Sequence, residues 1–304
     1  KKIKVVRGSR SKPQTTLKVQ PKTSAAHLFT KITTSPFYTE SNGQRALVLA
    51  SSKRGESAIY VKEKDAIDYA NQHGLIRNAI EQFRGTALPK LYDMILDKLC
   101  ECHFQDKTVK FRACELSRLT GNTEKHADRV KKRFVEAAHI LYEWSFRVKT
   151  SAKKIDFRMM ERVEETRGGF ILYMTDSAME IFSTAPKVVH DTELYKLKDQ
   201  NECAYNMGRW IEDFAIRQAQ KNGDSFKLVV FTMKAIMDSC AFIPSYLKDP
   251  REYAHRVPWL ESQFKEMNTD RVQFVDWGWV DGRPASIEEE KTKQIWCKFK
   301  HEHY

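Results

Sequence analysis

The clearest periodic pattern in the chain lies at residues 122–144, where apolar positions recur every three or four residues. This spacing predicts an amphipathic helix, because residues so spaced share one helical face. Gly121 allows the positive φ that ends a preceding helix, and Asn122 suits the N-cap of the next one. The buried face would consist of Ala127, Val130, Phe134, Ala138 and Leu141.

The flanking patterns predict the neighbours of this helix. A short alternating stretch at 109–112 predicts a strand, and residues 113–120 predict a helix that ends at Gly121. A hairpin with a charged tip follows, with strands expected at 146–149, 155–165 and 170–174. Strand, helix, Gly turn, second helix and hairpin, in that order, are typical of a winged helix-turn-helix domain.

The same order recurs in the second part of the chain. The pattern predicts a helix at 201–222, a strand at 226–231, a short helix that Thr232 caps, and a helix at 249–267 opened by Asp249 and Pro250. A strand at 271–280 with an Asp281–Gly282 turn completes the set. We therefore expect an α+β fold that is mostly helical, with two tandem winged helix-turn-helix domains.

The remaining residues complete the predicted domain organisation. Residues 1–45 lack periodicity and contain ten Lys and Arg but only one Glu, so they predict a flexible basic N-terminal arm suited to phosphate contact. We expect a first domain at 46–182, a linker at 183–191, a second domain at 192–284 and a C-terminal tail at 285–304. In the first domain we expect strands at 46–50 and 59–61 and helices at 63–73 and 86–104.

The helix at 86–104 has a wide apolar face with Pro89 in its first turn, where proline is tolerated. Its face would pack into the first domain, and part of it would suit a dimer seam. A homodimer is therefore one state that we expect.

The positions of the charged residues predict which side chains contact DNA. Lys125, Arg129 and Lys132 point away from the apolar stripe of the helix at 122–144, although an ordinary solvated face has the same appearance. In the second domain, Arg251 and His255 take the outward positions. The charged hairpin tip would reach the phosphate backbone. The full set of expected DNA-binding residues is Lys125, His126, Arg129, Lys132, Arg133, Lys149, Lys153, Lys154, Arg251, His255 and Arg256.

Composition narrows the function classes. The net charge is +12, which suits a nucleic-acid partner, and no apolar run would span a bilayer. The six cysteines form neither a C-x-x-C pair nor zinc-finger spacing, which fits a reducing cytoplasm and no metal cofactor. No phosphate-binding G-x-x-x-x-G-K-[ST] motif is present, so we do not expect a helicase-type ATPase. We expect a DNA-binding protein with no cofactor and no active site of its own.

Several short sequence patterns have an ordinary structural explanation as well as a catalytic or DNA-binding one. His301 and His303 would be metal ligands in a nickase but more often mark a frayed terminus. His126 and Arg129 match a recombinase H-x-x-R pattern, which also arises by chance. Trp277 and Trp279 would stack on melted DNA or lie in the core, and residues 288–290 would be a solvated helix start.

The chain resembles the iteron-binding plasmid replication initiators that carry two tandem winged-helix domains. The resemblance covers residues 86–284 and is carried by VKFRACELSRLTGNTEKHADRVKKRFVEAAHIL, NECAYNMGRWI, FIPSYLKDPREYAHRVPWLESQF and VDWGWV. It implies binding to origin repeats in double-stranded DNA, melting of the adjacent duplex, and recruitment of host initiator, helicase and primase. It implies recognition helices at 122–144 and 249–267. The alternatives are a winged-helix transcriptional repressor and a DNA nickase or recombinase.

Overall fold

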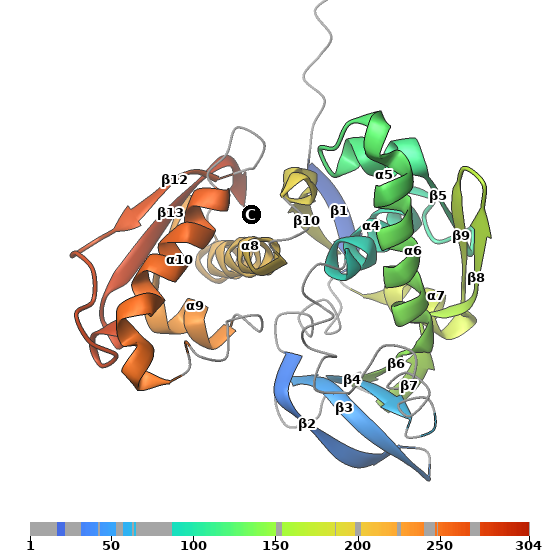
Figure 1. Cartoon of the computed structure of the whole chain (residues 1–304), viewed down its shortest axis with the longest axis horizontal. Helices are drawn as coiled ribbons and strands as arrows, with labels where there is room; N and C mark the ends of the chain where they lie inside the picture. The colour runs from blue at the N-terminus through green and yellow to red at the C-terminus, as the bar shows by residue number, and fades with distance from the viewer. Residues whose placement is uncertain are drawn as a thin grey trace, which may run out of the picture.

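The computed structural model describes residues 17–21, 32–41, 43–52, 57–62, 64, 87–149, 154–185, 187–197, 202–223, 226–239, 247, 249–267 and 274–303. Within these residues the fold is α+β, as predicted, with helices packed between four small antiparallel sheets (Figure 1). No helix of the described residues is long and apolar enough to cross a membrane. The helix expected at 63–73 lies almost entirely outside the described residues.

The first half of the molecule (the described residues between 32 and 185) contains the predicted helix pair. Strand β5 runs beside β9, which in turn pairs with β8 in a three-stranded sheet. The predicted helices at 86–104, 113–120 and 122–144 are confirmed, with the last one starting as a 3₁₀ turn. The elements are α4 (Leu88–Glu101), β5 (Thr108–Arg112), α5 (Ala113–Leu119), η3 (Glu124–His126), α6 (Ala127–Glu143), β8 (Met160–Thr166) and β9 (Gly169–Met174).

A five-stranded sheet extends the first half and corrects two expectations. The strand expected at 155–165 is two strands, interrupted near Met159, and the first of them pairs with the strand before it in a separate sheet. The basic arm expected to be flexible up to residue 45 contains an ordered strand of this same sheet. In sheet order the strands are β2 (Ile32–Ser41), β3 (Gln44–Ser52), β4 (Ser57–Lys62), β6 (Ser145–Lys149) and β7 (Lys154–Arg158).

The connection between the halves differs from the expected linker. Residues 183–191 begin inside helix α7 (Asp176–Thr184) and end in strand β10 (Lys187–Asp191). Strand β1 (Leu17–Pro21), from the expected arm, pairs antiparallel with β10 along its whole length. The 3₁₀ turn η4 (Thr192–Lys196) follows at once. The connection is thus hydrogen-bonded structure, because a strand from the N-terminal segment supplies the backbone partners that a free linker would lack.

The second half (the described residues between 202 and 303) also corrects one expectation. Residues 285–304, expected to be a tail, contain β13, which is the central strand of the sheet and pairs with both β11 and β12. The predicted helices at 201–222, 232–240 and 249–267 are confirmed. The elements are α8 (Glu202–Asn222), β11 (Phe226–Thr232), α9 (Met233–Ser239), η6 (Pro250–Glu252), α10 (Tyr253–Met267), β12 (Phe274–Trp279), η7 (Glu289–Lys291) and β13 (Gln294–His303).

The two halves repeat one topology. Each has a long helix, a strand, two helices and then two strands, if the β6–β7 hairpin in the first half is treated as an insertion. In each three-stranded sheet the last strand lies between the first and the middle one, giving the orders β5-β9-β8 and β11-β13-β12. Helices α6 and α10 occupy the same place in the repeat, and both face the viewer in Figure 1.

Apolar packing is continuous from one half to the other. Buried residues of α4, α6, α8 and α10 belong to one hydrophobic cluster. Residues 88–97 of α4 are buried on every side of the helix, so the face that was offered as a dimer seam is covered within this chain. Cys100, Cys102, Cys114 and Cys297 are free thiols.

Candidate nucleic-acid interface

The turn between α5 and α6 is fixed by local hydrogen bonds. Gly121 has φ of +68°, a conformation that residues with a Cβ adopt only at a cost. The Ser117 hydroxyl donates to the carbonyl of Thr123 at 2.8 Å, and the Asn122 amide donates to Thr120 Oγ1 at 2.9 Å. The Asn122 side chain therefore stabilises the turn through Thr120. It does not cap the next helix, so the prediction of an N-cap at Asn122 is wrong. These contacts set the angle at which α6 leaves α5.

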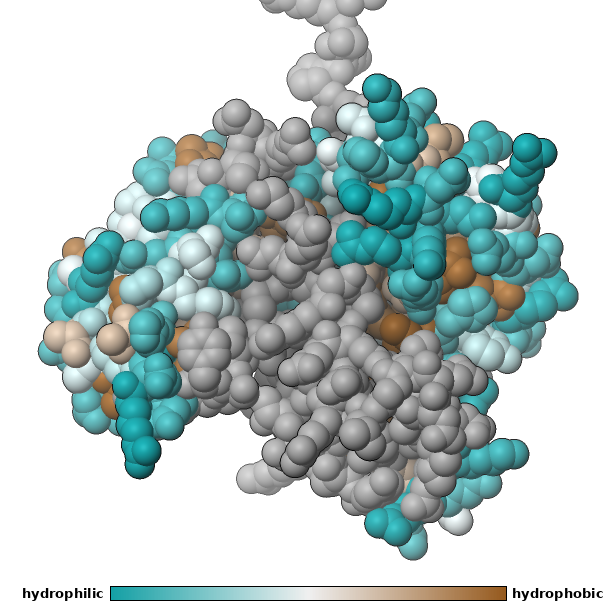
Figure 2. Space-filling view, viewed as in Figure 1, coloured by the Kyte–Doolittle hydropathy of each residue, from teal (hydrophilic) through white to brown (hydrophobic). Residues whose placement is uncertain are grey.

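The 3₁₀ turn η3 and the first turns of helix α6 present cationic side chains to solvent, and we call this surface the cationic start of α6. Lys125, His126, Arg129 and Lys132 are exposed, whereas Val130 on the opposite face is buried. The remaining expected contact on this helix, Arg133, is half-buried. The predicted outward positions are therefore confirmed as exposed, and strongly hydrophilic residues cover this part of the molecule in Figure 2.

The β8–β9 hairpin lies against α6 and is held there by a lysine that we did not single out from the sequence. Lys131 donates to the carbonyl of Thr166 at 2.8 Å and pairs with Glu165 at 2.9 Å. The next residue, Arg167, is exposed at the hairpin tip. Gly169 lets β9 approach β5, since a Cβ there would lie 1.9 Å from the carbonyl oxygen of Phe111. The Thr-Arg-Gly-Gly run was the available sequence signal for this tip.

Acidic side chains on strand β8 limit how closely the β8–β9 hairpin can approach a phosphate. Strand β8 exposes Glu161, Glu164 and Glu165, which repel phosphate. Arg162 on the same strand is directed to its neighbours, since its guanidinium lies over the Tyr173 ring and 3.5 Å from Glu164. Arg167, at the tip, is therefore the exposed cation of this hairpin that lies away from the acidic side chains of β8.

The structure does not bring the expected hairpin lysines to α6's cationic start. Lys149 and Lys154 belong to the β6–β7 hairpin of the five-stranded sheet, and Lys154 is exposed there. This hairpin follows the C-terminal end of α6, about 25 Å from its first turn at 1.5 Å per residue. Lys153 lies outside the described residues. The expectation that this hairpin is the wing is wrong, because β6 pairs with β4 instead of β5.

In the second half, η6 and α10 carry the exposed cations. Asp249 Oδ1 accepts the backbone N–H of Arg251 at 2.9 Å, so it caps the turn as predicted. Arg251 and His255 are exposed, and His255 lies 3.6 Å from Glu252. The apolar face of α10 points inward through Val257, Leu260, Phe264 and Met267.

Arg256 is placed in the interior, so the expectation that it contacts DNA is wrong. It is 8% exposed, and its Nε and Nη2 donate to the two carboxylate oxygens of Glu290 at 2.7 and 2.8 Å. Its Nη1 donates to the carbonyl of Leu247. Glu290, expected in a solvated helix start, is 2% exposed and is the partner that makes this burial possible.

The two tryptophans of β12 pack on α10. Trp277 stacks on Phe264 with ring centroids 4.7 Å apart, and Trp279 Nε1 donates to Glu261 at 3.0 Å. Both tryptophans are half-buried, which agrees with the expected alternative to base stacking, a role in the core. The exposed Arg283 pairs with the same Glu261 at 2.7 Å, so α10 and the loop after β12 are held together.

Tyr253 of α10 and the metal-ligating side chain types bear on the chemistry that this region can perform. The Tyr253 hydroxyl has a shifted pKa. Burial and the nearby Glu290 carboxylate raise this pKa to about 12. That hydroxyl donates to the carbonyl of Pro284 at 3.2 Å, so it is a structural contact. In the part of the chain that the structure describes, no three His, Cys, Asp or Glu side chains gather as a metal site.

No protein-family model matches the sequence, and no curated protein matches it. Solved structures that this chain is similar to include the Pi initiator protein in complex with iteron DNA, at 12% identity and a TM-score of 0.47, over 82% of this chain and 98% of that one. Two structures of RctB domains 2 and 3 have 10% identity and TM-scores of 0.40 and 0.39, each over 88% of this chain and 91% of that one.

Proposed function

We propose that the protein is a sequence-specific reader of double-stranded DNA that acts through two tandem winged-helix units at a plasmid replication origin. The observation that carries the proposal is the exposed cationic start of α6, with Lys125, His126, Arg129 and Lys132 on the second helix of a helix–turn–helix. A helix in this position enters the major groove with its first turns. The β8–β9 hairpin beside it supplies the wing.

The side chains divide into two roles. Arg129, one turn along the exposed face from Lys125, has the reach and the two-donor fork to recognise a guanine edge. Lys125 and Lys132 neutralise phosphates, which fixes the position of the helix on the duplex and makes affinity depend on salt. Arg251 and His255 perform the equivalent roles for the second unit, with fewer cations.

The biological step that we propose is initiation of replication. The two units bind origin repeats, the bound protein opens the adjacent duplex, and host initiator, helicase and primase are recruited to it. This part rests on the sequence resemblance to plasmid initiators. We propose no catalytic step for the chain itself, and we place its action in the cytoplasm, where plasmid DNA is replicated.

The DNA-reading proposal is tested by selecting bound sequences from a randomised duplex library with the full chain. The randomised region should span about four helical turns, so that two half-sites fit within it. We expect enriched motifs for the intact protein, and loss of preference at one base pair of one motif in Arg129→Ala. Arg217→Ala is the matched control, since Arg217 is an exposed arginine on α8 that pairs with Asp213 at 2.7 Å. Absence of any enriched motif would overturn the proposal.

The initiator role is separated from transcriptional repression by a second measurement on the selected DNA. Permanganate reactivity of thymines next to the bound repeats reports melting of the duplex. An initiator produces reactive thymines beside its binding site in supercoiled DNA, whereas a repressor leaves the duplex closed. A covalent protein–DNA adduct would instead establish a nickase or recombinase.

A further inference from the structure

The side of α4 that faces the second half is charged yet buried. Lys90, Asp93 and Asp97 follow one another at three- and four-residue spacing, so they share one face of the helix. They are 1%, 6% and 3% exposed. Charged side chains are rarely buried to this extent unless they are paired, so this face of α4 has specific polar partners.

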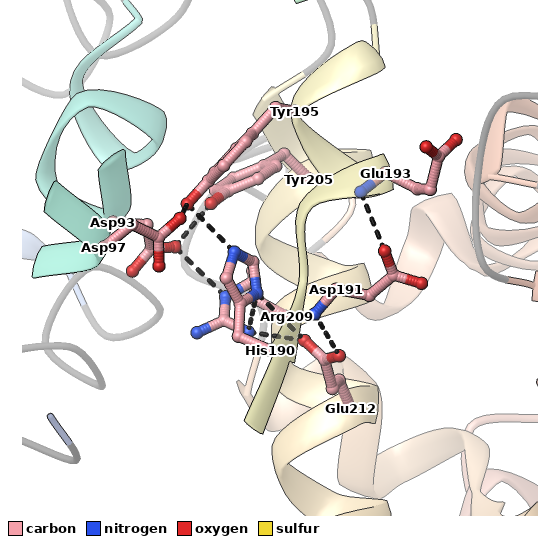
Figure 3. A network of polar contacts seen from close by, with 9 residues as sticks. All are labelled: Asp93, Asp97, His190, Asp191, Glu193, Tyr195, Tyr205, Arg209 and Glu212. Carbon is pink, nitrogen blue, oxygen red and sulfur yellow. Dashed lines mark hydrogen bonds and ion pairs between the residues drawn. The ribbon is translucent and has the colours of Figure 1, made fainter. Parts of the chain in front are cut away.

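Those partners come from the connection and from the second half (Figure 3). Asp93 accepts hydrogen bonds from the Tyr205 hydroxyl and, at 3.0 Å, from Arg209 Nε, both on α8. Asp97 accepts from the Tyr195 hydroxyl of η4 at 2.7 Å. Lys90 donates to the carbonyl of Leu197, just after η4. Each of these four contacts therefore joins α4 to residues beyond the first half.

A second layer of contacts orients these partners. Arg209 donates to Glu212 and lies 2.7 Å from His190 Nδ1, and His190 Nε2 lies 2.9 Å from the Tyr195 hydroxyl. Nδ1 of His190 also lies 3.4 Å from Glu212 Oε2, so the imidazole contacts Arg209, Glu212 and Tyr195 together. The Tyr195 hydroxyl donates onward to Asp97. His190 thereby connects the α8 side of the network to η4.

Strand β1 is connected to the network through β10. It pairs with β10, which carries His190 and Asp191, and the Asp191 backbone N–H donates to Glu212 Oε1 at 3.0 Å. Lys18 of β1 pairs with Glu101 at the end of α4, with 2.6 Å between the charged atoms. The N-terminal strand is therefore attached both to the connection and to the first half.

This network lies between the two helices that we propose to read DNA. Helix α4 packs on α6, and α8 packs on α10, so α6, α4, α8 and α10 form one continuous series of contacts. A buried polar network accepts few alternative arrangements, because any shift of α8 along α4 would leave Asp93 buried without its donors Tyr205 and Arg209. Apolar surfaces alone would tolerate such a shift more readily.

We infer that one polar network sets the distance and angle between α6 and α10, and hence the spacing between two DNA half-sites. The network consists of Asp93, Asp97, His190, Tyr195, Tyr205, Arg209 and Glu212. The inference rests on the proposed function for its DNA consequence. The residues are positioning residues, since they lie between the halves and away from the exposed cations. Spacing is then a property of the folded protein, whereas a flexible linker would accept several spacings.

The test removes the two α4 carboxylates together in the full chain. Asp93→Ala with Asp97→Ala deletes three of the four contacts named above and leaves Arg209 paired with Glu212. The matched control is Asp156→Ala, which deletes a half-buried aspartate ion pair, Arg147–Asp156 at 2.8 Å, that lies within the first half. Should the double variant fail to fold, Tyr195→Phe with Tyr205→Phe removes the two hydroxyl contacts while keeping the rings.

Two readouts keep the inference separate from the proposed function. Selection from a randomised duplex library should give two motifs at one spacing for the wild type and for the control, and the same motifs at several spacings for the double variant. Without DNA, spin-labelled unnatural amino acids at the exposed positions Glu136 and Ser262 should give a narrow distance distribution that the double variant broadens.

The results for the double variant test the inference, and the result for the wild type tests the proposed function. An unchanged spacing and an unchanged distance distribution in the double variant would overturn the inference. If the wild type selects only one motif, the tandem-reader function fails, and the distance distributions alone then decide whether the network orients the two halves.

Discussion

Arg256 and Glu290 form a buried, two-pronged ion pair that links α10 to the 3₁₀ turn before β13, with donor–acceptor distances of 2.7 and 2.8 Å. Arg256 lies next to the exposed His255 in the sequence, yet it is buried where His255 meets solvent. Arg256 also donates to the carbonyl of Leu247. One helical turn thus carries both a proposed DNA-facing residue and the residue that ties α10 to the rest of its half.

Arg256→Ala is expected to destabilise the protein, because it leaves Glu290 charged and buried without this partner. Removing one member of a buried pair costs roughly 3–5 kcal/mol. Urea unfolding followed by circular dichroism measures the loss. Arg251→Ala, an exposed arginine five residues earlier, is the control and should change the free energy of unfolding by less than about 0.5 kcal/mol. Equal stabilities for the two variants would contradict the buried role of Arg256.

Arg129→Ala and Arg251→Ala are expected to weaken different parts of a DNA footprint. If Arg129 recognises a guanine, its loss costs roughly 1–3 kcal/mol of binding free energy on specific DNA. Hydroxyl-radical footprinting should show two protected patches about one helical turn apart for the intact chain. Each variant should weaken one patch. Weakening of the same patch by both would mean that only one half binds DNA.

Deleting residues 1–21 is expected to lower the thermal unfolding temperature, whereas deleting residues 1–16 should not. The longer deletion removes β1, its pairing with β10 and the Lys18–Glu101 ion pair. The shorter deletion ends just before β1. Calorimetry on the two truncated proteins makes the comparison, and identical unfolding temperatures would show that β1 contributes nothing to the folded state. In DNA binding, both deletions should reduce the salt dependence of affinity, since both remove cations.

Local patterns predicted most of the described helices, although not α7. Apolar periodicity located α4, α5, α6, α8 and α10, because a helix that buries one face must repeat its apolar residues every three or four positions. The exposure of Lys125, Arg129 and Lys132 followed from the same periodicity. Where a prediction needed only one element and its own buried face, the sequence contained the information.

Pairing between distant segments was not visible in the sequence. Strand β1 is a short stretch with few apolar residues, and it is held by β10, about 170 residues away. Strand β13 was expected to be a tail because its role depends on β11 and β12 beside it. Arg256 was expected on the surface because its partner Glu290 is 34 residues distant. A charged residue on an amphipathic helix looks solvated until its buried partner is known.

The network between α4 and the second half makes a prediction about pH. Burial raises the pKa of Asp97 above its ordinary value of 3.8, with a further increase from the neighbouring Asp93. His190, Tyr195 and Lys18 act in the opposite direction but do not outweigh burial. Because the pKa is higher in the folded chain than in the unfolded one, the folded state binds this proton more tightly. The stabilisation from this proton is therefore complete below about pH 3.8 and is lost as the pH rises through the folded-state pKa.

Asp97→Asn isolates this contribution, since the substituted amide retains an oxygen that accepts from Tyr195 but has no titrating proton. The free energy of unfolding of the wild type minus that of Asp97→Asn is expected to increase as the pH falls from about 7 towards about 4. Urea unfolding at a series of pH values measures this difference, and Asp128→Asn, at an exposed aspartate of α6, is the control substitution. A difference that is constant over this range, or that decreases on acidification, would contradict a pKa of Asp97 that burial between α4 and η4 has raised.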